Sequence, residues 1–157
     1  MNINSRTYIS GHAYIGPDFG GLHEAAAPEM PKKALEPKYT DYIAPRQARR
    51  MSRILKMGVS AGLMALQKAG ADSPDAIITA TGLGCLQDSE KFLLNMTENN
   101  ESLLNPTAFI QSTHNTAGAQ LALAIGCKAH NITHSNKYTS FQTALLEAML
   151  MLELTET

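Results

Sequence analysis

The segment from Ile132 to Leu154 constrains the fold more than any other part of the chain. Residues 130–135 favour a β-strand, and residues 141–154 follow as a run that is apolar on nearly every side of a helix. Its polar exceptions are Gln142, Thr143, Glu147 and Glu153. A helix of this composition is normally buried in a protein core. The segment therefore predicts a buried strand that leads directly into a buried helix.

The junction between this strand and this helix is the first candidate for a functional site. In α/β folds, reactive groups and anionic ligands commonly lie where the carboxyl end of a strand meets the amino terminus of a helix. The residue to inspect as a nucleophile at this junction is Tyr138, which is neither a cysteine nor a serine. Thr139 and Gln142 have the spacing of a capping box that would begin the helix.

The last helix also raises a question of packing. A helix that is apolar on all sides needs a covering layer on both sides, and the sequence ends at Thr157, soon after it. We expect residues 145–154 to be covered by another chain or by sequence beyond Thr157.

The preceding residues alternate between helix-like and strand-like patterns. We expect a strand over 8–15, a long loop over 16–44, a helix over 45–70, a strand over 75–82, and helices over 88–95 and 115–126. Pro45 suits the start of the first helix and Gly70 its end, Asp88 and Ser89 are available as caps, and Asn115 could cap the helix after it. The small residues of 115–126 permit close approach of another backbone. This order predicts one α/β domain over 1–157 with a mainly parallel sheet.

Composition argues against several functional classes. The formal net charge is −1 and only 17% of the residues are charged, which leaves no basic field for nucleic acid and no polybasic run for a lipid surface. The amino terminus lacks the pattern of a signal peptide, and no apolar run reaches the roughly 18 residues of a membrane span. We therefore expect a cytoplasmic protein.

Four arginines lie near the start of the long predicted helix: Arg46, Arg49, Arg50 and Arg53. Helical spacing would place them on one side of its first turns. Two interpretations stay open, a solvated face with local carboxylate partners or a docking site for an acidic partner.

Cysteines, histidines and a glycine turn give weaker signals. Cys85 and Cys127 lie far apart outside any CxxC pattern, so they do not indicate a disulfide framework. Cys85 follows a strand and precedes a helix, where a lowered thiol pKa is physically allowed, whereas Cys127 reads as a buried structural thiol. His130 and His134 would share a strand face, but no Asp or Glu lies nearby in the sequence, so we predict no metal site. TGLGC lacks the full GxGxxG spacing, and we predict no cofactor.

Several short blocks, in order, resemble the amino-terminal half of the β-ketoacyl synthases of the thiolase-like superfamily. These blocks are ARRMSR at 48–53, the helix ending at Ala69 and Gly70, IITATGLGC, NPTAFIQSTHNTAGAQLALAIG, and the strand-to-helix junction. The resemblance covers nearly the whole chain. It implies a mainly parallel or mixed sheet with helices on both faces, and a carboxyl-terminal half of the family fold that this sequence does not contain.

In this resemblance Tyr138 stands where ordinary members carry a nucleophilic cysteine, at a helix amino terminus that lowers its pKa. A phenol with a pKa of about 10 is a poor acyl acceptor near neutral pH. The chain is therefore similar to members without the cysteine, such as chain length factors, which pair with an active ketosynthase. The resemblance also implies acyl carrier protein as the acidic partner of the four arginines. It places five residues at a pocket or interface: Phe109, His114, Asn115, Thr139 and Ser140.

Three hypotheses follow. The first is a noncatalytic ketosynthase-like subunit that pairs with an active ketosynthase in fatty acid or polyketide synthesis, with Tyr138 blocking or shaping the acyl tunnel. The second is an active β-ketoacyl-ACP synthase or acyltransferase fragment whose nucleophile lies elsewhere, at Cys85. The third is an assembly module without an acyl site. The sequence alone leaves open whether the chain is an enzyme.

Overall fold

The computed structural model describes residues 11, 13, 15, 34–102 and 104–155. Most of the expected 8–15 strand and the 16–33 part of the expected loop lie outside these residues. The elements are η1 (Tyr39–Asp41), α1 (Pro45–Ala48), α2 (Arg53–Ala69), β1 (Ala76–Ala80), α3 (Leu86–Glu98), α4 (Pro106–Ser112), α5 (Thr116–Ile125), β2 (His130–His134), η2 (Lys137–Thr139) and α6 (Ser140–Thr155). In the described part of the chain, no helix is long and apolar enough to cross a membrane.

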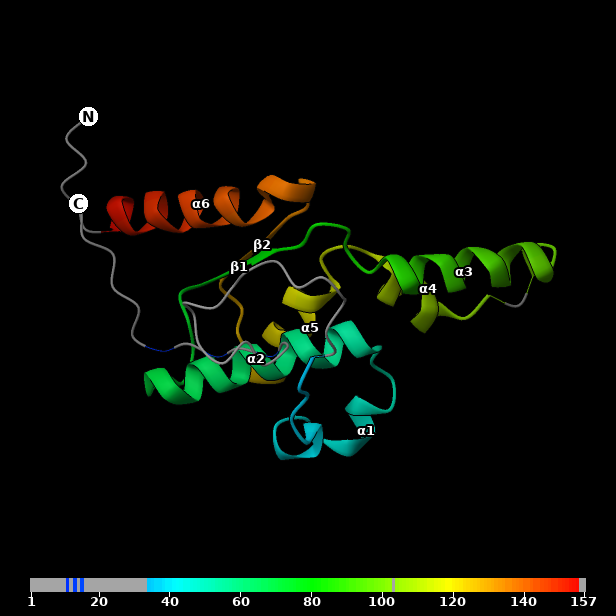
Figure 1. The fold of residues 1–157 in the computed structure, drawn as a ribbon, viewed down its shortest axis with the longest axis horizontal. Coiled ribbons are helices and arrows are strands. Elements are labelled where there is room, and N and C mark those ends of the chain that lie inside the picture. The colour runs from blue at the N-terminus through cyan, green and yellow to red at the C-terminus, as the bar shows by residue number, and fades with distance from the viewer. Residues whose placement is uncertain (1–10, 12, 14, 16–33, 103, 156–157) are drawn as a thin grey trace, which may run out of the picture.

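A two-stranded parallel sheet forms the centre of the fold (Figure 1). Ala76 of β1 pairs with His130 of β2, and the register runs to Ala80 and His134. Because side chains alternate along a strand, the two faces of β2 carry different residues. His130 and His134 contact α6, whereas Asn131 donates a hydrogen bond to the Gly118 carbonyl of α5.

Helices therefore cover both faces of the sheet, as expected. Figure 1 shows α6 on one side of the strands, and α5 with α2 behind it on the other. The expected strands at 75–82 and 130–135 are confirmed as β1 and β2, and their parallel pairing confirms the α/β class. The main core cluster lies on the α2 side and consists of Ile43, Met51, Leu55, Val59 and Cys85.

The predicted helix over 45–70 is wrong at one point, since the structure has two helices there. The helix α1 ends at Ala48, and α2 begins after Ser52, whose backbone is extended. The intervening turn directs Met51 into the core, where only 7% of its surface is exposed. The ends of the prediction are confirmed, because Pro45 begins α1 and Gly70 follows α2 with a φ of 65°.

The region between the strands contains a helix that the sequence patterns did not predict. The helix α3 runs to Glu98, beyond the expected end at 95, and α4 follows it from Pro106. The Asn105 side chain caps α4 by accepting a hydrogen bond from the Thr107 N–H at 2.9 Å. Phe92 of α3 packs against Phe109 of α4 with ring centroids 5.5 Å apart. The two helices form a pair that extends away from the sheet in Figure 1.

The predicted close approach at the small-residue helix is confirmed at Gly118 of α5. A Cβ atom at Gly118 would lie 2.7 Å from Thr79 Oγ1 and 2.9 Å from Asn131 Oδ1. These distances are shorter than any normal contact, so only glycine allows α5 to lie this close to the sheet. Gly126 ends the helix with a φ of 66°, which confirms the expected stop.

Candidate functional site

The candidate site begins where β2 turns into α6. The turn passes through Lys137, whose φ of 52° is left-handed and uncommon for a residue with a side chain. Tyr138 follows, and 95% of its surface is exposed. In the part of the chain that the structure describes, the phenol has no buried surroundings. If Tyr138 blocks an acyl tunnel, the walls of that tunnel must come from outside these residues.

Ser140 is the first residue of α6 and is held from three sides. Its hydroxyl oxygen lies 2.8 Å from the Thr81 carbonyl, 2.9 Å from the Lys137 carbonyl and 2.8 Å from the Asn136 N–H, from which it accepts a hydrogen bond. One hydroxyl proton is shared between the two carbonyls. The residue is buried, so the hydroxyl fastens α6 to the end of β1 and is not presented to solvent.

The expected capping box is not what begins α6. The hydroxyl of Thr139 donates a hydrogen bond to the Asn136 carbonyl at 3.0 Å. The backbone carbonyl of Thr139 accepts a hydrogen bond from the Thr143 hydroxyl at 2.9 Å. The helix starts one residue later, at Ser140. Thr139 therefore belongs to the turn, and Ser140 makes the contacts that fix the helix end.

The glycine turn after β1 lies between this junction and the start of α5. Thr81 contacts Ser140 through its carbonyl, and its hydroxyl accepts a hydrogen bond from the Gly84 N–H at 2.9 Å. Gly84 has a φ of 63°, and a Cβ there would lie 3.0 Å from the Cβ of His114. The turn thus links the expected site residues Ser140 and His114 through a glycine that needs both its conformation and its small size.

Cys85 follows this turn and does not have the properties of a nucleophile. Only 4% of its surface is exposed. Burial raises the pKa of the Cys85 thiol, and the nearby Asp88 carboxylate raises it further. The expectation that its position could lower the pKa is wrong, because burial among apolar side chains disfavours the thiolate.

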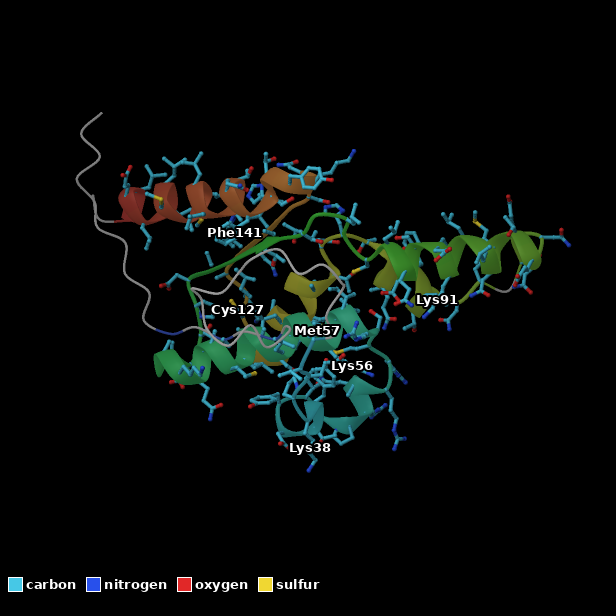
Figure 2. All side chains as sticks on the ribbon, in the orientation of Figure 1. Lys38, Lys56, Met57, Lys91, Cys127 and Phe141 are labelled. Carbon is cyan, nitrogen blue, oxygen red and sulfur yellow. The ribbon has the colours of Figure 1, made fainter. Side chains whose placement is uncertain are left out.

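Other predicted site residues are spread over the surface. Phe109 is exposed on α4, and His114 and Asn115 are exposed before α5. Asn115 stands at the amino end of α5, but its side chain makes no capping hydrogen bond, contrary to the expected cap. Among the described residues, no hydrogen bond joins these three to Tyr138 or Thr139. Cys127, beyond the end of α5, is half-buried and its thiol donates to the Pro74 carbonyl at 3.5 Å (Figure 2).

The caps expected for α3 take other roles. The cap position belongs to Cys85, which makes no side-chain capping bond. Ser89 donates to the Ser112 carbonyl at 2.7 Å and so ties α3 to α4. Asp88 is buried, and one of its carboxylate oxygens has no hydrogen-bond partner among the described residues.

The four arginines do not share one helix face, because the break after α1 separates them. Arg53 opens α2 and donates to Glu36 at 2.5 Å, which is the local carboxylate partner allowed by the first interpretation. The Tyr39 hydroxyl also donates to Glu36 at 2.5 Å. These hydrogen bonds, first from Tyr39 and then from Arg53, lower the pKa of Glu36. Burial, followed by the bond to Glu36, raises the pKa of Tyr39 to about 12.

The other three arginines, Arg46, Arg49 and Arg50, are exposed. In the described ranges, none of them has a carboxylate oxygen within ion-pair distance. The four arginines therefore form two groups. Arg53 on α2 is paired with Glu36, whereas the three arginines on α1 and the following turn have no carboxylate partner among the described residues.

His130 and His134 do share a strand face, and a carboxylate that the sequence patterns missed lies between them. Glu147 of α6 is 2.7 Å from His134 Nε2 and 3.4 Å from His130 Nε2. The sequence near the pair contains no acidic residue, and the structure supplies one from 13 positions after His134. The signal was nonlocal, since Glu147 reaches the pair only after α6 folds onto β2. Within the described part, no group of three such side chains has an arrangement that could hold a metal ion.

The outer side of α6 is apolar. Ser140 and Ala144 are buried toward the sheet, and Glu147 points to the histidines. Large apolar residues on the remaining surface are exposed: Phe141, Leu145, Leu146 and Leu150. A helix that was covered on both sides would bury them.

The comparisons with known proteins fit this architecture. Residues 22–157 match the family model for the amino-terminal domain of β-ketoacyl synthases. The chain belongs to the β-ketoacyl synthase family. This identifies the sheet, the glycine turn and the β2–α6 junction as parts of a thiolase-like amino-terminal domain and confirms the resemblance. No curated protein sequence matches the chain.

A solved structure gives the same fold for this ketosynthase-like chain. It is the ketosynthase (ApeO) in complex with its chain length factor (ApeC) from Xenorhabdus doucetiae, with a TM-score of 0.70 and 24% sequence identity. The match covers 91% of this chain and 60% of the matched chain. This protein therefore corresponds to only part of the matched chain, about 60% of its length.

Proposed function

We propose that this protein is a noncatalytic, chain-length-factor-like subunit that pairs with an active ketosynthase in cytoplasmic fatty acid or polyketide synthesis. The observation that carries the proposal is the residue at the β2–α6 junction. In the family resemblance this position belongs to a cysteine, and here it is Tyr138. A phenol is a weak acyl acceptor near neutral pH.

Among the described residues, neither Ser140 nor Cys85 has the properties of a replacement nucleophile. The Ser140 hydroxyl is engaged with two carbonyls and a backbone N–H, so it is not presented to a substrate. Cys85 is buried, and burial keeps its pKa above the ordinary range. Both observations support a role in which the chain shapes a site without performing the acyl transfer.

The exposed apolar side of α6 supports a partner. Phe141, Leu145 and Leu146 lie beside the junction and would lose contact with water if a second layer packed on them. In the matched structure a ketosynthase is in complex with its chain length factor, which supports a protein partner for a chain of this fold. Burial of these side chains by a ketosynthase, together with Tyr138, would place the phenol at the wall of the shared acyl tunnel.

Co-production with the ketosynthase from the same genomic neighbourhood tests this proposal. We expect the two proteins to copurify, and we expect Tyr138→Ala to change the distribution of product chain lengths because it removes the ring from the tunnel wall. Tyr138→Phe is the matched control, since it keeps the ring and should keep the distribution. Identical products from all three confirmed complexes would reject the role of Tyr138.

The alternative of an active enzyme with Cys85 as nucleophile has a direct test. Exposure to a cysteine-directed inhibitor of condensing enzymes, followed by mass spectrometry of peptides, should leave Cys85 unmodified under conditions that modify the ketosynthase. Rapid and selective modification of Cys85 would overturn the noncatalytic proposal.

An assembly module without an acyl site is the third candidate, and the 95% exposed surface of Tyr138 favours it over the second. It differs from the first in its relation to acyl carrier protein, for which we propose Arg46, Arg49 and Arg50 as the docking surface. Reversal to Glu at these unpaired arginines should weaken carrier protein binding strongly. Arg53→Glu should have a smaller effect, because Arg53 already pairs with Glu36. No measurable binding by the parent complex would favour the assembly module.

A further inference from the structure

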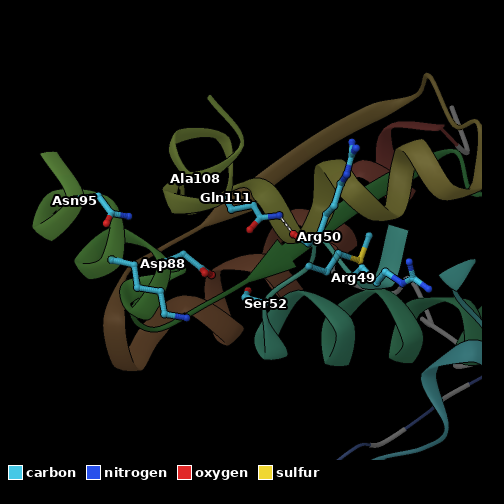
Figure 3. Close-up of a pocket in the computed structure, with 9 residues that line it drawn as sticks. Arg49, Arg50, Ser52, Asp88, Asn95, Ala108 and Gln111 are labelled. Carbon is cyan, nitrogen blue, oxygen red and sulfur yellow. Dashed lines mark hydrogen bonds between the residues drawn. The ribbon is translucent and has the colours of Figure 1, made fainter. Parts of the chain in front are cut away.

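A cavity of about 270 Å³ lies between the α1–α2 turn, α3 and α4. The residues around it that matter here are Arg49, Arg50 and Ser52 from the turn, Asp88 and Lys91 from α3, and Gln111 from α4. The Gln111 amide donates a hydrogen bond to the Arg50 carbonyl, which joins α4 to the turn and closes one wall (Figure 3). The cavity lies away from Tyr138, which is not among its lining residues.

Two of the lining residues each hold a buried polar atom that has no hydrogen-bond partner in the described part of the chain. Asp88 is 7% exposed, and its atom without a partner is Oδ2. The other atom is the hydroxyl oxygen of Ser52. Figure 3 shows the Asp88 carboxylate pointing from α3 toward Ser52. Burying a carboxylate oxygen and a hydroxyl without partners is costly, so a ligand that donates hydrogen bonds to them would be stabilised.

The rim of the cavity is basic. Arg49, Arg50 and Lys91 are exposed, and among the described residues no carboxylate lies within ion-pair distance of them. In Figure 3 the guanidinium groups of Arg49 and Arg50 point away from Asp88, so these long side chains are free to turn toward a bound anion. Three cations against one carboxylate disfavour a metal ion or an ammonium group and favour a ligand with net negative charge.

We propose that this cavity binds a small phosphorylated polyol, with a hydroxyl group on Asp88 and Ser52 and the phosphate at the rim. A phosphate dianion suits the arginines and the lysine, and a hydroxyl supplies the donor that Asp88 lacks. The volume is below that of most drug-sized sites, which limits the ligand to about the size of a sugar phosphate. This site is separate from the junction at Tyr138 and needs no partner protein.

Calorimetric titration of the purified protein with three probes tests the proposal. The probes are glycerol 3-phosphate, propyl phosphate and inorganic phosphate, and the first differs from the second by its hydroxyl groups. We expect glycerol 3-phosphate to bind at least about tenfold tighter than propyl phosphate, because hydrogen bonds to a charged group are strong. Equal affinities would overturn the assignment of Asp88, and the absence of binding by all three would overturn the site.

Variants separate the rim from the interior. Lys91→Gln should weaken the binding of all three probes by about tenfold or more, because an ionic contact to the phosphate is lost. Arg46→Gln makes the same change of charge on α1 outside the cavity and should leave binding unchanged. Equal losses from Lys91→Gln and Arg46→Gln would indicate a diffuse basic field and overturn the proposal.

Asp88→Asn should change phosphate binding in a way that unfolding of the variant would not. Removal of the negative charge should strengthen binding of inorganic phosphate, while the preference for glycerol 3-phosphate over propyl phosphate should fall. Circular dichroism checks that the variant is folded, and Lys91→Gln provides the independent test if it is not. Binding of acyl carrier protein without binding of any of the three probes would assign the basic rim to protein docking and reject the polyol phosphate.

Discussion

The two faces of the β1–β2 sheet are covered by helices that are fixed in different ways. On one face, α5 lies so close that Gly118 has no room for a side chain, and α2 packs behind it as a second layer. On the other face, α6 is held by polar contacts, from Ser140 to Thr81 and from Glu147 to His134, and its outer side is apolar and exposed. On the α5 face close packing fixes the helix, and α2 forms a second layer behind it. On the α6 face a few polar contacts fix the helix, and the described residues provide no second layer.

The largest effect should come from a charge on the outer side of α6. Leu146→Glu is expected to weaken association with the ketosynthase by about 100-fold or more, because the partner would have to bury a carboxylate. Surface plasmon resonance with the purified partner measures the loss. Gln87→Glu adds a charge at an exposed position of α3, outside α6, and should have a much smaller effect.

If sequence beyond Thr157 covers α6 instead, Leu146→Glu should lower the free energy of unfolding of the longer protein and leave association unchanged. A variant that changes neither quantity would show that the outer side of α6 is not buried by any layer.

A methyl group at Gly118 should disturb the closely packed face. Gly118→Ala is expected to lower the free energy of unfolding by about 1–3 kcal/mol, because the new Cβ would overlap Thr79 and Asn131. Urea unfolding measures this change. Gly58→Ala in α2 is the matched control, since its Cβ would lie at an ordinary 3.7 Å from Ala117. This control should be neutral or stabilise by about 0.5–1 kcal/mol, because alanine favours a helix more than glycine does.

The polar contacts that hold α6 on the sheet should contribute somewhat less to the free energy of unfolding than the close packing at Gly118. Glu147→Ala is expected to lower the free energy of unfolding by about 1–2 kcal/mol through loss of its hydrogen bond to His134. His130→Ala should cost less than His134→Ala, since the His130 side chain is 45% exposed and that of His134 is 14% exposed. A larger effect at His130 would contradict the geometry of the pair.

The smallest effect concerns the reactivity of Cys85, which is buried in the core on the α2 side of the fold. Because its pKa is raised, the Cys85 thiol should form its reactive thiolate only at higher pH than an ordinary cysteine, and alkylation by iodoacetamide should be slower than at Cys127. Asp88→Asn should move the pH profile of Cys85 only slightly downward, because burial is the larger cause and remains. Equal alkylation rates for both cysteines at pH 7 would contradict a sealed core.

Local patterns in the sequence predicted the parts of the fold that depend on local physics. Both strands follow from β-prone runs, and the ends of α2 and α5 follow from glycines that adopt positive φ. The helix break at Ser52 was missed because Met51 fits the apolar stripe of a continuous helix, whereas burial of Met51 decides the turn. The helix α4 was missed although Asn105 and Pro106 carry an ordinary start signal.

The candidate site was predictable only in outline. The junction and the importance of Tyr138 follow from the sequence and the family resemblance. The contact of Glu147 with the histidines, the hold on Ser140 and the orphaned oxygen of Asp88 depend on residues brought together from distant segments. Periodicity and spacing carry no information about such contacts, and so the sequence patterns could not reveal them.

The pairing of Ala76 with His130 has a consequence for the order in which the protein folds. All of α3, α4 and α5 lie between the two strands in the sequence, so β1 leaves the ribosome well before its partner exists. At typical rates of synthesis β2 follows β1 after about 3–10 s. During that interval the hydrogen-bonding groups of β1 have no parallel neighbour in β2, and the nascent chain depends on helix formation until the sheet can close.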